Sequence, residues 1–162
     1  MEYLRFSWEE TERAVWSICK KIQEVSFKPD TIVAISRGGL VPAKLFSDAL
    51  DVRDLRVIRL SFYEAMGKRM DEPRLVDPLP GSIEGKRVLL VDDISDSGES
   101  FRAAMAHLLA RNPASLKTAS IHMKEGSPFK PDFFFQTNTK WVVYPWEKQE
   151  FTRDTGEKLV GQ

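Results

Sequence analysis

The sequence lacks the features of several protein classes. It has one cysteine, Cys19, so no disulfide can form within the chain, and a small secreted scaffold stapled by disulfides is excluded. Neither charge sign is in excess, because 24 Lys and Arg residues balance 24 Asp and Glu residues, whereas nucleic-acid-binding domains are usually clearly basic. The longest wholly apolar runs, such as Val88–Val91, are far too short to span a bilayer. We therefore expect neither a membrane nor a nucleic acid among the partners.

What is present fits one globular domain. The 162 residues are 42% hydrophobic and 30% charged, which argues against disorder and allows a core of ordinary size. Residues 1–13 are too acidic and too broken in hydrophobicity for a secretory signal, so we expect a cytoplasmic protein. We expect residues 1–150 to form the single domain and residues 151–162 to form a C-terminal tail.

Strand-like and helix-like segments alternate along the chain. Apolar residues recur at helical spacing after a capping-box pattern from Ser7 to Glu10, and Cys19 falls on that apolar stripe, where a packed thiol is expected. The alternation predicts an α/β fold, with a central, mainly parallel sheet and helices on both faces. In such folds, ligands bind at the carboxyl ends of the strands. The expected helices are 8–26, 40–50 and 101–109, and the expected strands are 31–35, 56–61, 87–91, 116–123, 133–135 and 141–144.

Residues 63–84 differ in kind from the rest of the chain. They contain three prolines, two glycines, many charges and few apolar residues, so no helix or strand is expected there. A connection of this length without secondary structure is uncommon in a compact domain. Two interpretations stay open: a mobile loop that takes part in function, or an ordinary solvated surface loop.

The sharpest motif is Val88–Ser100, which has the sequence VLLVDDISDSGES. A buried strand ends in two carboxylates, Asp92 and Asp93, and a turn rich in serine and glycine then leads into a helix. Backbone N–H groups at such a turn can cradle an anion, and adjacent carboxylates suit a sugar diol or the waters of a bound Mg²⁺ ion. Read singly, each residue could instead be a solvated acid or a helix cap. The acidic pocket of a receiver domain is disfavoured, because too few residues follow Asp93 to complete one.

The Val88–Ser100 motif resembles the phosphoribosyl-pyrophosphate (PRPP) motif of the type I phosphoribosyltransferases. Two further segments resemble that family and follow its order along the chain. Ile35–Pro42 is similar to the pyrophosphate loop after the first strand, and Trp141–Glu147 is similar to the purine-binding hood of the small xanthine/hypoxanthine-guanine enzymes. The resemblance spans about residues 8–150 and implies the type I fold with a small C-terminal hood over about 124–150.

The resemblance implies roles on the sugar and phosphate side of the site. Asp92 and Asp93 would hold the ribose and a Mg²⁺ ion, the ion through water. Asp96 would act as general base near the purine N7, because the purine must lose or share a proton as it attacks. The family often has a non-proline cis peptide in the pyrophosphate loop, which here would fall at Ser36-Arg37. Pyrophosphate would be bound by Ser36, Arg37 and Gly38, and the 5′-phosphate by Asp96, Ser97, Gly98, Glu99 and Ser100.

The resemblance also implies roles on the base side. Lys124 would donate to the exocyclic O6, which favours a 6-oxopurine, because the 6-amino group of adenine cannot accept that hydrogen bond. Trp141 would stack on the purine, and the backbone of Val142 would read its edge. Taken alone, Lys124 could equally be a surface lysine and Trp141 a core residue. Glu147 stands where the family usually has Asp, and Tyr63 would open the family's flexible loop.

The implied reaction is transfer of the 5-phosphoribosyl group from PRPP to hypoxanthine, guanine or xanthine, which forms the nucleotide and pyrophosphate in purine salvage. The implied partners are PRPP, the purine base, a Mg²⁺ cofactor and further copies of the chain in a homodimer or homotetramer. Two alternatives remain open. One is a transferase for adenine or another base, and the other is a catalytically silent protein of this fold that regulates through RNA or a repressor partner. The zero net charge counts against RNA.

Overall fold

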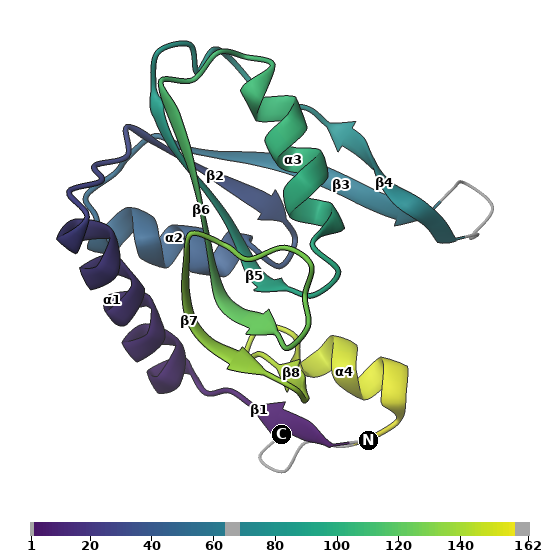
Figure 1. Ribbon diagram of the computed structural model, residues 1–162. Helices are drawn as coiled ribbons and strands as arrows, with labels where there is room; N and C mark the ends of the chain where they lie inside the picture. The colour runs from purple at the N-terminus through teal and green to yellow at the C-terminus, as the bar shows by residue number, and fades with distance from the viewer. Residues whose placement is uncertain (1, 64–68, 158–162) are drawn as a thin grey trace.

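The computed structural model describes residues 2–63 and 69–157. Within these ranges the main element is a six-stranded sheet with the order β4-β3-β2-β5-β6-β7 (Figure 1). Neighbouring strands are parallel from β3 through to β7 in that order, and β4, at the edge, runs antiparallel to β3. This architecture confirms the expected fold class. The strands are β2 (Thr31–Ser36), β3 (Leu55–Tyr63), β4 (Arg69–Asp77), β5 (Arg87–Ser95), β6 (Ser115–Lys124) and β7 (Phe133–Asn138).

Helices cover the sheet on both faces. α1 (Trp8–Glu24) and α2 (Leu40–Ala49) lie on one face, and α3 (Glu99–Leu109) lies on the other (Figure 1). α1 begins at the predicted capping box, in which the Ser7 hydroxyl accepts from the Glu10 N–H and the Glu10 carboxylate accepts from the Ser7 N–H. No helix in the described part of the chain is long and apolar enough to cross a membrane.

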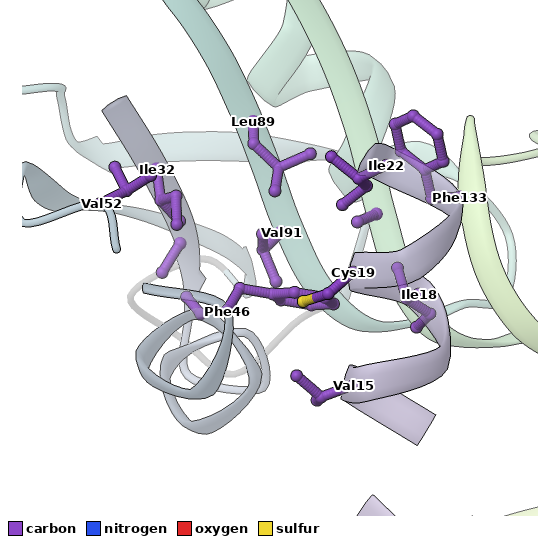
Figure 2. Close-up of a cluster of buried hydrophobic side chains, with 13 residues drawn as sticks. Val15, Ile18, Cys19, Ile22, Ile32, Phe46, Val52, Leu89, Val91 and Phe133 are labelled. Atoms are coloured by element: carbon purple, nitrogen blue, oxygen red, sulfur yellow. The ribbon is translucent and has the colours of Figure 1, made fainter. Parts of the chain in front are cut away.

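The core between α1, α2 and the sheet is built from aliphatic and aromatic side chains (Figure 2). Ile18 and Phe46 from the helices pack with Leu89 and Val91 of the central strand. Cys19 lies among them and is 1% exposed, and burial raises the pKa of its thiol to about 12. The thiol is therefore a packed and unreactive side chain, as predicted.

A second, two-stranded sheet joins segments from the two ends of the chain. β1 (Tyr3–Arg5) pairs in parallel with β8 (Trp141–Val143), and α4 (Lys148–Thr155) follows β8. We refer to β1, β8, α4 and the residues between β8 and α4 as the hood. The buried Phe151 ring of α4 meets the Tyr3 ring edge-on, with 4.7 Å between centroids. The expected domain boundary at residue 150 falls inside α4, so the first residues of the expected tail belong to this helix.

The expectation of a structureless connection over 63–84 is wrong. Residues 69–77 form β4, which extends the sheet beside β3. Beyond β4, Leu79 is buried against the α3 face of the sheet, and its N–H donates to Nε2 of His107 at 3.0 Å. The sequence pattern does not predict β4 because it is an edge strand, where charged residues and proline are tolerated. The tip of this hairpin, residues 64–68, lies outside the described residues.

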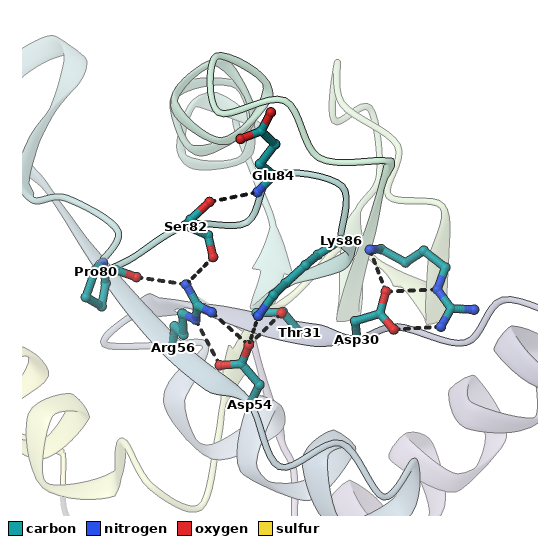
Figure 3. A network of polar contacts seen from close by, with 9 residues as sticks. Asp30, Thr31, Asp54, Arg56, Pro80, Ser82, Glu84 and Lys86 are labelled. Atoms are coloured by element: carbon teal, nitrogen blue, oxygen red, sulfur yellow. Dashed lines mark hydrogen bonds and ion pairs between the residues drawn. The ribbon is translucent and has the colours of Figure 1, made fainter.

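A network of ion pairs closes the end of the sheet where β2, β3 and β5 begin (Figure 3). Asp54 accepts from Arg56 and Lys86 at 2.8–2.9 Å, and these cations hold the pKa of its carboxyl well below the usual range. Asp30 pairs with Arg87 at 2.6 Å, and its pKa is lowered in the same way. The carboxylates at this end therefore lie beside cations.

Candidate active site

The site is built at the opposite end of the sheet, around the last residues of β5. Pairing with β2 stops at Ala34 opposite Val91, whereas pairing with β6 continues to Ser95. Asp92 and Asp93 thus lie inside a strand that is longer than predicted, and they are 8% and 7% exposed. The two carboxylates therefore lie just beyond the last residue of β5 that pairs with β2. This is the carboxyl side of the sheet, where the motif predicted them.

The loop after β2 lies directly against the end of β5. A Cβ atom on Gly38 would stand 2.6 Å from a carboxylate oxygen of Asp93, and one on Gly39 would collide with the carbonyl oxygen of Val91. Only glycine allows this close approach, so the two glycines hold the loop in contact with the aspartate pair. The Ser36-Arg37 peptide bond is cis, as the resemblance implied.

The hood binds the arginine of this loop. Nη2 of Arg37 donates to both carboxylate oxygens of Glu150 in α4, at 2.7 Å each. A guanidinium has five N–H donors, so this ion pair leaves donors for a second anion. Arg37 and Gly38 line a hollow together with Trp146, Glu147 and Glu150 of the hood. The predicted pyrophosphate loop is thus adjacent to the hood.

The turn between β5 and α3 has the backbone of an anion cradle. Gly98 has a φ of 77°, in the left-handed region, and a Cβ atom there would collide with Phe129. α3 starts at the next residue, Glu99, whose carboxylate pairs with Arg102 at 2.6 Å. The acid inside the predicted phosphate turn is thereby balanced within the helix. Three other members of the turn are at least partly exposed: Asp96, Ser97 and Ser100.

A pocket beside the aspartate pair brings the expected base-side residues together. Lys124 ends β6, and Trp141 begins β8 with 54% of its surface exposed. Because both contribute to one pocket, the alternatives of an isolated surface lysine and a core tryptophan are disfavoured. The pocket is lined by Asp93, Ile94, Asp96, Lys124, Lys140, Trp141, Val142, Tyr144 and Glu147.

The carboxyl groups of Asp92, Asp93 and Glu147 lie close together at and beside this pocket. The side chains of Asp93 and Glu147 both line the pocket and interact with each other, and the Asp93 N–H donates to Oδ1 of Asp92 at 2.9 Å. Burial raises the pKa of all three carboxyl groups, and the charge of Asp93 raises the pKa values of Asp92 and Glu147 further. A cation bound here would relieve this repulsion.

The oxygen donors of the aspartate pair fit a Mg²⁺ ion. Mg²⁺ in proteins is usually held by one or two carboxylates together with waters and substrate phosphates. Asp92 and Asp93 supply such carboxylates next to the Arg37 loop. Within residues 2–63 and 69–157, no three His, Cys, Asp or Glu side chains form a group that could hold a metal on their own. The pair therefore suits an ion shared with a bound diphosphate.

Some parts of the site were not predicted, and one predicted side chain lies outside the described residues. Tyr63 ends β3, but its side chain lies outside the described residues. Lys140, which directly precedes the predicted stacking residue Trp141, also lines the pocket, and Tyr144 of the predicted hood segment lines it too, although no role was predicted for either residue. Glu150 had no signal, because its partner Arg37 is far away in sequence.

Comparison with known proteins agrees with this arrangement. A family model described as the phosphoribosyl transferase domain matches residues 7–150. The xanthine-guanine phosphoribosyltransferase of Idiomarina loihiensis is 30% identical over 143 residues, which cover 87% of this chain and 84% of that protein. The enzyme of the same name from Gluconobacter oxydans is 26% identical, with 91% and 86% covered. The crystal structure of a purine phosphoribosyltransferase from Pyrococcus horikoshii is 33% identical, with a TM-score of 0.80 over 90% of this chain and 94% of that one. The chain therefore belongs to the type I phosphoribosyltransferase family, as its motifs had suggested.

Proposed function

We propose that this protein transfers the 5-phosphoribosyl group from PRPP to a 6-oxopurine, either hypoxanthine, guanine or xanthine, and releases pyrophosphate in purine salvage. The observation that carries this proposal is the pocket in which Lys124, Trp141 and Asp96 lie beside Asp93. The similarity to xanthine-guanine enzymes supports a purine as the acceptor.

On the base side, three side chains have distinct tasks. Lys124 carries N–H donors that suit the 6-oxo group of the base. The half-exposed Trp141 ring offers a face on which a purine can stack. The carboxylate of Asp96 takes the proton that the purine loses as its nitrogen attacks the ribosyl carbon. Together, Lys124, Trp141 and Asp96 would bind an oxopurine and activate it within one pocket.

On the phosphate side, two backbone turns bind the anions. The N–H groups around Gly98 and the start of α3 suit the 5′-phosphate, and Arg37 with the Gly38 loop suits the pyrophosphate. Asp92 and Asp93 fix the ribose and would hold the Mg²⁺ ion, which supplies positive charge to the leaving pyrophosphate. The sugar is thereby held between its two phosphate sites, with the base pocket next to it.

The test is an assay of pyrophosphate release with PRPP, Mg²⁺ and each of guanine, hypoxanthine, xanthine and adenine. We expect turnover with at least one oxopurine and little with adenine. Preference for adenine would refute the base class, and absence of turnover with every base would favour the silent regulator. Lys124→Met should lower kcat/KM for the oxopurine about 10-fold or more, because a buried polar group of the base loses its partner. Lys20→Met, on an exposed position of α1, is the matched control.

The family resemblance also implies a homodimer or homotetramer, and this stays a prediction. Light scattering of the purified chain measures its mass against the 18.5 kDa of one copy.

A further inference from the structure

A row of hydrogen bonds runs from β7 to the aspartate pair, through side chains that have no role in the mechanism above. Nε2 of Gln136 lies 3.3 Å from Nε2 of His122, and Nδ1 of His122 lies 2.8 Å from the hydroxyl of Tyr144. That hydroxyl lies 3.0 Å from the main-chain oxygen of Asp93. His122 and Tyr144 are 0% and 1% exposed, so the row crosses the interior and joins β7, β6, the hood and β5.

The main-chain oxygen of Asp93, the last group in the row, determines which atom of each hydrogen bond carries the proton. A main-chain carbonyl oxygen can only accept, so the Tyr144 hydroxyl donates its one proton to Asp93. The hydroxyl must then accept from His122, which carries its proton on Nδ1 and leaves Nε2 free to accept from the Gln136 amide. Every bond therefore points toward Asp93 and the imidazole is neutral. Burial lowers the pKa of His122 to about 4, which agrees with a neutral ring.

Aromatic packing keeps the row in place. The Phe6 ring meets the His122 ring edge-on at 4.8 Å between centroids. The Trp146 ring stacks on the Tyr144 ring at 4.7 Å, with 6° between their planes. Interiors packed in this way have few alternative arrangements, and a fully satisfied polar row within them favours a single geometry.

Tyr144 stands between the two halves of the reaction. It follows Trp141 and precedes Glu147 in the hood, yet its hydroxyl is bonded to the main chain of one of the sugar-side aspartates. Transfer requires the attacking nitrogen and the ribosyl carbon to approach to about 3–3.5 Å, and a misplacement of about 1 Å can cost on the order of 100-fold in rate. The bond between Tyr144 and Asp93 links the element that carries the base to the element that carries the sugar.

We propose that Tyr144, supported by His122, is a positioning residue that holds the base-carrying hood in register with the Asp92–Asp93 pair. This inference rests on the proposed transferase function. Neither side chain touches the reacting atoms in this role. They act by keeping the distance between the two substrates constant.

Tyr144→Phe tests the inference, because it removes the hydroxyl and keeps the ring that stacks on Trp146. We expect kcat to fall about 10-fold, the size typical of one buried donor left unsatisfied. The KM for PRPP should stay within about two-fold of wild type, because the carboxylates and both phosphate turns are unchanged. Tyr3→Phe removes a hydroxyl from the hood outside the row and should leave kcat unchanged.

A double variant separates positioning from simple stabilisation. In Tyr144→Phe the Nδ1–H of His122 loses its acceptor, and adding His122→Leu removes that donor, so the melting temperature should recover. If the row positions the hood, kcat stays low in the double variant. Recovery of kcat together with stability would overturn the proposal, as would a kcat of Tyr144→Phe within two-fold of wild type or a parallel rise in the KM for PRPP.

Gln136→Leu, at the exposed end of the row, serves if the buried variants do not fold. We expect a fall in kcat of about two- to three-fold at unchanged KM for PRPP, because the His122 ring loses one of its two anchors. An unchanged kcat would overturn the proposal. Absence of transferase activity in the wild-type protein would refute the proposed function instead, so the two failures are distinguishable.

Discussion

The two ends of the central sheet carry similar carboxylates in opposite electrostatic settings. Where β2, β3 and β5 begin, Asp30 and Asp54 lie beside basic side chains, and the pKa of each carboxyl is lowered. Where the strands end, Asp92, Asp93 and Glu147 lie beside one another, and burial raises the pKa of each. At the first end, each carboxylate is stabilised by a neighbouring cation. At the second end, the carboxyl groups lie close together, and their charged forms repel one another.

This difference separates stability from function along one sheet. Paired carboxylates favour the folded state, and buried carboxylates without cations oppose it, so the second arrangement is typical of a site kept for its chemistry. A substrate complex that brings Mg²⁺ would neutralise the crowded end. We therefore expect substitutions at the first end to lower stability and leave turnover alone, and substitutions at the second end to lower turnover without lowering stability.

The largest effect is expected for Asp96→Asn at the crowded end. Loss of the general base should lower kcat about 100-fold, while PRPP binding changes little because the phosphate turn keeps its backbone donors. Steady-state kinetics with PRPP and the preferred base measure both quantities. Asp154→Asn, on an exposed position of α4, is the control. Near-normal turnover of Asp96→Asn would remove Asp96 from this role.

Next in size is Asp54→Asn at the paired end. The variant leaves Arg56 and Lys86 close together without their carboxylate, and the free energy of unfolding should fall by about 2 kcal/mol. Urea denaturation measures this loss, and kcat per folded molecule should equal that of wild type. A drop in kcat at unchanged stability would contradict the division between the two ends.

A smaller effect, opposite in sign, is expected for Glu147→Gln in metal-free protein. Burial raises the pKa of Glu147 to about 8, so between its ordinary pKa and pH 8 the folded state keeps a proton that the unfolded state has lost. Wild-type stability therefore falls as the pH rises through this range, and glutamine removes that fall. Because Glu147 is only partly buried and Asp93 beside it titrates in the same pH range, only part of the full linkage should appear as stability, and the variant should gain about 1 kcal/mol over wild type at pH 8 relative to the difference at pH 4. Thermal melts at the two pH values measure it, and an equal effect at both would contradict the assignment.

The smallest effect is expected for Asp77→Asn on the β3–β4 hairpin. Asp77 pairs with Arg59, but the two side chains are 64% and 51% exposed, so solvent screens the ion pair. The free energy of unfolding should change by no more than about 0.5 kcal/mol. A loss comparable to that of Asp54→Asn would show that ion pairing alone, rather than burial of the pair, stabilises the first end.

The central sheet and its helices could be predicted because their signals are local. β5 is a continuous apolar run, and α1 starts at a capping box, so each is visible within about a dozen residues. The motif also predicted that Asp92 and Asp93 lie at the carboxyl side of the sheet, and the hood segment contributes to the pocket beside them. The roles given to these individual residues stay predictions.

The elements that were missed depend on contacts between distant residues. β4 is an edge strand with mixed polarity, and β1 is a three-residue strand that has no pattern of its own until it pairs with β8. The ion pair of Arg37 with Glu150 and the row from Gln136 to Asp93 join residues far apart in the chain. Tertiary packing, rather than local propensity, determines all of these features.

The parallel pairing of β1 with β8 also orders events during synthesis. Tyr3–Arg5 leaves the ribosome early, but its partner Trp141–Val143 follows only on the order of ten seconds later at ordinary elongation rates. The aspartate pair and the two phosphate turns can take shape in the nascent chain before the hood exists. A newly made molecule thus forms the end of β5 and its turn first, and the pocket beside them is completed only after residues 141–147 have been translated.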